Sequence, residues 1–147
     1  MEVIALNKKL CMSTLPFVIV MRSDSNVKGS LYSPVLKNNV EFFDLTSLFT
    51  MMDKIVDDVN IPRCDEKFRR FNKNSKFEKL EYVDFLDDKA LNRYLVTLKN
   101  FKTYKNIYFV EIMRRQNYSW QGKVTWLEKK KTKCFRSELE LMKLICN

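Results

Sequence analysis

The sequence predicts a single α+β domain, residues 1–147, in which an antiparallel sheet carries its helices on one face. Three observations indicate this fold. The chain has 147 residues, which is within the usual size of one domain. Stretches with a two-residue alternation of apolar side chains are followed by stretches with three- and four-residue spacing. Two segments, about 13–59 and 105–147, also resemble each other along their whole length.

We therefore expect two pseudo-symmetric repeats, each running strand, strand, an optional short strand and helix. Residues 60–104 would form a helical insertion between them. Together the repeats would build a sheet of about five or six strands. Gly29 and Gly122 are the only two glycines, and they occupy matching places, each after a polar stretch. This match predicts equivalent turns at the two glycines, and Phe43 and Phe135 follow them in the same order.

The first repeat begins with the apolar run from Phe17 to Met21, which predicts a strand. From Leu45 to Val59 the apolar residues recur at helical spacing, so one face of a helix should be buried there. The pair Ile61-Pro62 is typical of a helix end. Within the insertion, Leu91, Tyr94, Leu95 and Leu98 predict another amphipathic helix that starts near Asp87 or Asp88.

The second repeat begins with a matching segment from Phe109 to Met113, which is apolar except for Glu111. Trp120, Val124 and Trp126 then alternate with polar residues, which predicts a strand with one buried face. Ser137 followed by Glu140 has the spacing of a capping box, so we expect the last helix to start at Ser137.

The C-terminal part of the chain carries a longer motif. The residues from Arg115 to Glu128 read RQNYSWQGKVTWLE, and those from Phe135 to Leu141 read FRSELEL. This pattern resembles a group of short proteins of clostridial and related bacteria that carry RQNxSWQGxVxWLE followed by FRSxLEL. The group has no established activity. The resemblance implies a bacterial or phage cytosolic origin and a hairpin followed by a helix, and it supplies no functional residues.

The residue types that most catalytic sites need are scarce. Histidine is absent, and two glycines cannot form the loops that hold nucleotide phosphates. Cys11, Cys64, Cys134 and Cys146 have no chelating spacing, so we expect no metal and no cofactor. Cys134 and Cys146 occupy apolar-face positions, which favours packed thiols. We therefore expect that the protein is not an enzyme.

No apolar run approaches the about 18 residues that a membrane span needs, and the N-terminus lacks the basic region of a secretory signal. Scattered cysteines are typical of reduced thiols in the cytosol. We expect a cytoplasmic protein with no membrane partner.

Positive charge dominates the surface chemistry, with 27 Lys and Arg against 18 Asp and Glu, a net charge of +9. A surface of this kind favours anionic partners. The candidate binding cations are Arg69, Arg70, Lys73, Arg114, Arg115, Lys123, Lys129, Lys130, Lys131 and Arg136. Phe71 and Trp120 are the candidate aromatic anchors. The alternative is that these cations are simply solvated, with Lys129–Lys131 at a hairpin tip and the aromatic residues in the core.

Two functions fit these features. The first is a small protein-binding inhibitor or adaptor that docks on a larger host complex, of the kind used by phages and mobile elements. An anti-CRISPR-like anti-defence protein would be one instance. The alternative is direct nucleic-acid binding, in which Lys and Arg neutralise phosphates. The oligomeric state has no signal in the sequence.

Overall fold

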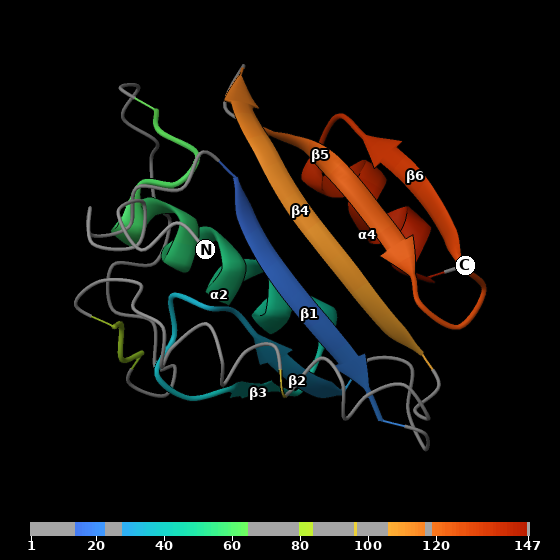
Figure 1. The fold of residues 1–147 in the computed structure, drawn as a ribbon, viewed down its shortest axis with the longest axis horizontal. Coiled ribbons are helices and arrows are strands. Elements are labelled where there is room, and N and C mark those ends of the chain that lie inside the picture. The colour runs from blue at the N-terminus through green and yellow to red at the C-terminus, as the bar shows by residue number, and fades with distance from the viewer. Residues whose placement is uncertain are drawn as a thin grey trace.

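The computed structural model describes residues 14–22, 28–64, 80–83, 96, 106–116 and 119–146. Six strands form one antiparallel sheet in the order β3-β2-β1-β4-β5-β6, with β1 and β4 side by side at its centre (Figure 1). The strands are β1 (Leu15–Met21), β2 (Gly29–Tyr32), β3 (Val40–Phe42), β4 (Ile107–Gln116), β5 (Ser119–Trp126) and β6 (Lys131–Phe135). The predicted α+β class and antiparallel sheet are confirmed.

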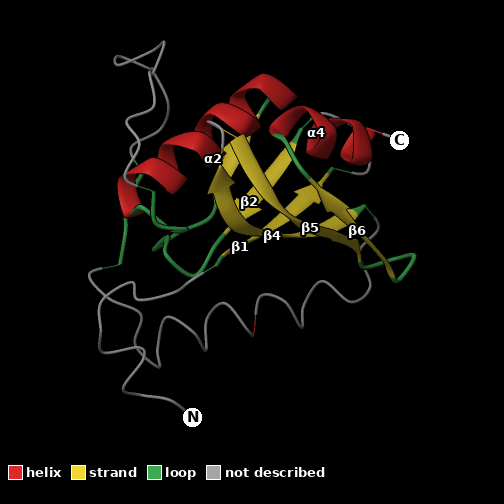
Figure 2. Ribbon diagram, turned by 90° about the horizontal axis from the view of Figure 1, so that it is seen from above, coloured by secondary structure: helices red, strands yellow, loops and turns green. Residues whose placement is uncertain are grey.

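Two helices, α2 (Leu45–Val59) and α4 (Glu138–Cys146), lie on the same face of the sheet, as Figure 2 shows. Each follows three strands in the chain, so that β1-β2-β3-α2 is succeeded by β4-β5-β6-α4. Among the described residues, neither helix is long and apolar enough to cross a membrane.

The main core lies between the sheet and the two helices. Alternate residues of β1, such as Leu15, Phe17 and Ile19, point into it and are fully buried. On the opposite face of the sheet, Val18 and Ile107 form a second, smaller buried cluster. Both faces of the central strands are therefore apolar.

The helix α2 starts where a capping box closes its first turn. The Ser47 amide donates to Asp44 Oδ1 at 2.6 Å, and the Asp44 amide donates back to Ser47 Oγ at 3.2 Å. The helix spans the predicted residues, and it ends at Asn60, whose φ of 52° is left-handed. Leu48, Met52 and the other apolar residues of its predicted face are buried or packed against the core.

The helix α4 is capped as predicted, since the Glu140 amide donates to Ser137 Oγ at 3.1 Å. The expected burial of Cys134 and Cys146 is wrong, because both are exposed. In β6 the alternation turns Phe135 inward and its neighbour Cys134 outward, and Cys146 is the last residue of its helix.

The two glycines lie in strands and not in turns. Gly29 is opposite Phe42 in the sheet, and Gly122 is opposite Phe135. A Cβ on Gly29 would clash with a backbone oxygen of an adjacent strand and come within 2.9 Å of the Phe42 ring. A Cβ on Gly122 would likewise clash with a backbone oxygen of an adjacent strand and come within 3.0 Å of the Phe135 ring. The buried counterpart of Phe135 is thus Phe42, while Phe43 is 65% exposed.

Most of the predicted insertion lies outside the described residues, and so does the start of its helix near Asp87 or Asp88. Residues 80–83 run beside the segment that precedes β3. The Val83 amide donates to the Val35 carbonyl, and the Lys37 amide donates to the Glu81 carbonyl, each at 3.0 Å. Val96 is helical and 55% exposed.

Candidate functional site

The hairpin formed by β5 and β6 carries the densest charge among the described residues. Between positions 119 and 136 the sequence has six cations and one carboxylate. The strands pair from Gly122 opposite Phe135 to Trp126 opposite Lys131, and residues 127–130 form the turn. Lys130 in this turn has a φ of 51°. The hairpin therefore carries positive charge both at its tip and along the outermost strand of the sheet.

Four lysines of this hairpin form a continuous exposed group, which we call the basic edge. It consists of Lys129, Lys130, Lys131 and Lys133. In the part of the chain that the structure describes, none of their ammonium groups forms an ion pair. Arg136, just beyond β6, instead has Glu140 at 3.6 Å, with its own side chain 87% exposed. Among the residues that the structure describes, no carboxylate therefore forms an ion pair that would offset the charge of the basic edge.

The structure separates the other predicted cations from the basic edge. Lys123 lies opposite Cys134, so it is on the sheet face that points away from the helices. Arg114 pairs with Gln121, two residues from Lys123 on β5, and therefore lies on that face too. Both belong to a different surface. The remaining candidates Arg69, Arg70, Lys73 and Phe71 lie outside the described residues.

Arg115 is not a surface cation. Its side chain is only 2% exposed and donates from Nη1 to Asp57 Oδ1 at 2.9 Å and from Nε to the Pro62 carbonyl at 2.8 Å. A further hydrogen bond runs from Nη2 to Asn60 Oδ1. Arg115 therefore ties β4 to the C-terminal end of α2.

A β-bulge explains why Arg115 points inward. The register shifts between Ile112 and Arg114, so that Met113 is an extra residue in β4. Without it, strict alternation from the buried Ile112 would turn Arg114 toward the helices and Arg115 away from them. The bulge reverses the two positions, and Arg114 becomes the exposed one.

Trp120 is a core residue and not an exposed anchor. It is 3% exposed, and its ring stacks on Phe49 with the centroids 6.2 Å apart. Its amide donates to Glu138 Oε1 at 2.6 Å, and the hydroxyl of Ser119 donates to the same oxygen at 3.1 Å. These hydrogen bonds connect the start of β5 to the start of α4.

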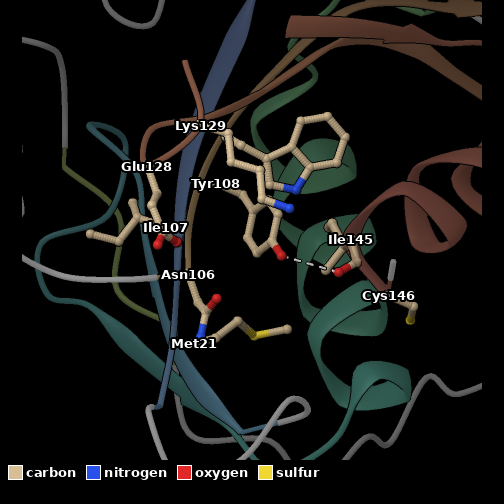
Figure 3. Close-up of a pocket in the computed structure, with 9 residues that line it drawn as sticks. Met21, Asn106, Ile107, Tyr108, Glu128, Lys129, Ile145 and Cys146 are labelled. Carbon is tan, nitrogen blue, oxygen red and sulfur yellow. Dashed lines mark hydrogen bonds between the residues drawn. The ribbon is translucent and has the colours of Figure 1, made fainter. Parts of the chain in front are cut away.

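A pocket of about 150 Å³ lies beside the turn of the hairpin, and sequence reasoning missed it. Figure 3 shows its labelled lining, with the Tyr108 hydroxyl directed at the Ile145 carbonyl, to which it donates at 3.2 Å. The rings of Tyr108 and Trp126 meet edge to face, 5.9 Å apart. Glu128 and Lys129 of the turn also line the pocket, so it adjoins the basic edge.

Burial is the main reason that the pKa of Tyr108 lies above its ordinary value of 10.0. A hydrogen bond with Trp126 works in the opposite direction, while the charges of Cys146 and Glu128 add to the rise. The hydroxyl therefore stays protonated and remains a donor at neutral pH. Tyr108 and Trp126 are far apart in the sequence, and the register of β4 and β5 places them opposite each other.

Within the described ranges no group of three or more Cys, Asp or Glu residues is arranged to hold a metal ion. No family model, no curated protein and no solved structure matches this chain.

Proposed function

We propose that this protein is a non-catalytic binding module that docks through its basic edge on an acidic face of a larger protein or nucleoprotein complex. Such a module acts as an inhibitor or adaptor, and anti-CRISPR-like inhibition of a host defence complex is one role of this kind. The observation that carries the proposal is the group of four exposed lysines at one end of the sheet with no ion pair among the described residues.

Fold stability does not account for this arrangement. Neighbouring like charges repel, and an exposed ion pair would contribute only about 0.2–1 kcal/mol in any case. Lysines on an edge strand discourage aggregation, which would explain the presence of Lys131 and Lys133 on β6. Lys129 and Lys130 lie in the turn, where no strand edge needs protection. A concentrated positive surface does, however, speed association with an acidic partner.

We also infer that the two halves of the sheet are repeats of one unit. Support comes from the matching element order and from a glycine that faces a buried phenylalanine ring in each half, Gly29 with Phe42 and Gly122 with Phe135. If the halves are repeats, β3 and β6 are equivalent edges. Only the β6 edge carries the lysines, so the charge belongs to one copy and is not a requirement of the fold.

The small volume of the pocket beside Tyr108 favours a partner that docks on the surface over a small molecule that binds inside the pocket. Pockets for small molecules typically enclose about 300–1,000 Å³, whereas the pocket beside Tyr108 encloses about 150 Å³. Among the described residues of the hairpin, the tryptophans also offer no exposed ring to nucleobases, since Trp120 is in the core and Trp126 is half-buried. Single-stranded nucleic acid is usually held by such stacking, so we favour a protein face over direct nucleic-acid binding.

The test compares two variants with equal charge. Lys130→Glu with Lys133→Glu changes the basic edge, and Lys37→Glu with Lys143→Glu changes two exposed lysines elsewhere. Immobilised wild type and both variants are exposed to a nuclease-treated bacterial lysate, and the association rate of the retained complex is measured at several salt concentrations. We expect the basic-edge variant to bind at least about tenfold more slowly, and the control to behave like the wild type.

Equal loss of binding in both variants would mean that only net charge matters, and unchanged binding in both would remove the basic edge from the function. A labelled 30-mer oligonucleotide provides the nucleic-acid comparison. If it binds at about 0.15 M salt with a steep salt dependence that the basic-edge variant abolishes, the protein binds nucleic acid directly and the proposal is wrong.

A further inference from the structure

We infer that the partner contributes an acidic, extended segment that pairs with β6 as a seventh strand of the sheet. This inference rests on the proposed function, because it specifies how the basic edge would hold its partner. It commits to a peptide segment with acidic residues at alternate positions.

The first step is the open edge of the sheet. β6 is the last strand in the order, and among the described residues it pairs only with β5. In an antiparallel sheet about half of the backbone amides and carbonyls of an outermost strand point away from their only neighbour. Residues 131–134 are all exposed. Their outward backbone groups can therefore receive another strand.

The second step is the difference between the two edges of the sheet. β3, at the other end, has only three residues, and its outward side chain is Glu41. β6 has five residues and carries lysines. An extended peptide could form more hydrogen bonds with β6, and an acidic one would be repelled at β3. The peptide should therefore add to one edge only.

The third step is the pattern of side chains on β6. Lys131 and Lys133 share one face of the sheet, and Thr132 and Cys134 share the other. On the second face Thr132 Oγ1 lies 2.9 Å from Thr125 Oγ1, so that surface is small and polar. A strand pairing with β6 would complement both faces if acidic residues alternated with threonine. Opposite charges directly across a strand pair attract one another.

The same charges argue against self-association through this edge. Two β6 strands paired with each other would bring the lysines of both copies together, and like charges opposite one another are unfavourable. Strand addition is a known way in which a sheet edge recognises a peptide, with the backbone providing affinity and the alternate side chains providing specificity. The occupant that fits here is an acidic segment of another protein.

The experiment uses the full chain and three synthetic peptides. The probe, which we call the alternating peptide, is the acetylated and amidated octapeptide TETETETE. One control has the same sequence with N-methyl groups on alternate residues, which removes backbone donors and keeps the charge. The other control is the block peptide TTTTEEEE, which has the same composition without the alternation. Binding is measured by titration, and hydrogen exchange of the backbone amides locates the peptide on the protein.

We expect the alternating peptide to bind at least about tenfold more tightly than either control, since each lost hydrogen bond or charge contact weakens the complex. The bound peptide should slow exchange of amides in β6 and leave those of β3 unchanged. Lys131→Glu with Lys133→Glu should abolish this binding, while the Lys37→Glu, Lys143→Glu control retains it.

Equal binding of the N-methylated peptide, protection away from β6, or no binding of the alternating peptide would overturn strand addition. If the Lys130→Glu, Lys133→Glu variant then still loses its partner from the lysate, docking through charge survives and only strand addition fails. If partner capture is also unaffected by that variant, both proposals fail.

Discussion

Replacing Arg115 with methionine is expected to lower the free energy of unfolding by about 3–5 kcal/mol, the usual cost of removing one partner of a buried ion pair. The side chains of Arg115 and Asp57 are 2% and 13% exposed. Methionine would keep most of the packed volume but remove the cation that lies 2.9 Å from the Asp57 carboxylate. It would also remove donors from the Pro62 carbonyl and Asn60 Oδ1, each worth about 0.5–1.5 kcal/mol.

A domain of this size has a total stability of about 5–15 kcal/mol, so the loss is measurable by urea unfolding followed by circular dichroism. Arg114→Met is the matched control, because this neighbour is exposed and should change stability by no more than about 0.5 kcal/mol. Asp57→Asn completes a double-mutant cycle with Arg115→Met, and we expect a coupling of about 1–3 kcal/mol.

If Arg115→Met unfolds the protein outright, Arg115→Lys provides the measurement, since a lysine keeps the charge but cannot reproduce the hydrogen bonds that the guanidinium donates to Asp57, Asn60 and Pro62. We expect an intermediate loss for this variant. A cost below about 1 kcal/mol for Arg115→Met, or equal costs for Arg114→Met and Arg115→Met, would refute the structural role assigned to the buried guanidinium.

Two other predictions concern the sheet and the pocket. Gly29→Ala and Gly122→Ala should each destabilise the fold by about 1–3 kcal/mol in urea unfolding, because the new Cβ would clash with a backbone oxygen of the adjacent strand. A loss below about 0.5 kcal/mol at either position would contradict the close contact between the glycine and that strand. Tyr108→Phe should cost about 0.5–1.5 kcal/mol at pH 8 through the lost hydrogen bond to Ile145. Because folding raises the pKa of Tyr108, the stabilisation by its hydroxyl is complete below pH 10.0 and is lost as the pH rises through the folded-state pKa. The stabilities of wild type and variant should therefore converge above about pH 10. A difference in stability that stays constant from about pH 8 to above about pH 10 would show that the hydroxyl is not buried.

Much of the secondary structure could be predicted from short stretches of sequence. The alternation from Trp120 to Trp126 corresponds to β5, and the apolar spacing from Leu45 to Val59 corresponds to α2. Ser137 caps α4 as its spacing with Glu140 indicated. These features are accessible because strand alternation, helical periodicity and capping each depend on residues only a few positions apart.

The candidate site was only partly predictable. Lys129, Lys130 and Lys131 were identified from composition, and the structure places them at the hairpin turn and the start of the outermost strand. Composition could not separate them from Lys123, which lies on the sheet face away from the helices. Which face a residue occupies, and whether its strand is at an edge, depends on the order and register of strands that are distant in sequence.

The sequence by itself determined the α+β class, the local elements and the excess of positive charge, because each follows from residue type or short-range spacing. The tertiary structure decided how these residues are used. One extra residue in β4, at Met113, reverses the sheet faces that Arg114 and Arg115 occupy. As a result Arg115 is buried and forms an ion pair with Asp57 of α2. Close packing of strands placed Gly29 and Gly122 beneath phenylalanine rings. Such outcomes arise from contacts between residues far apart in the chain, and no local pattern encodes them.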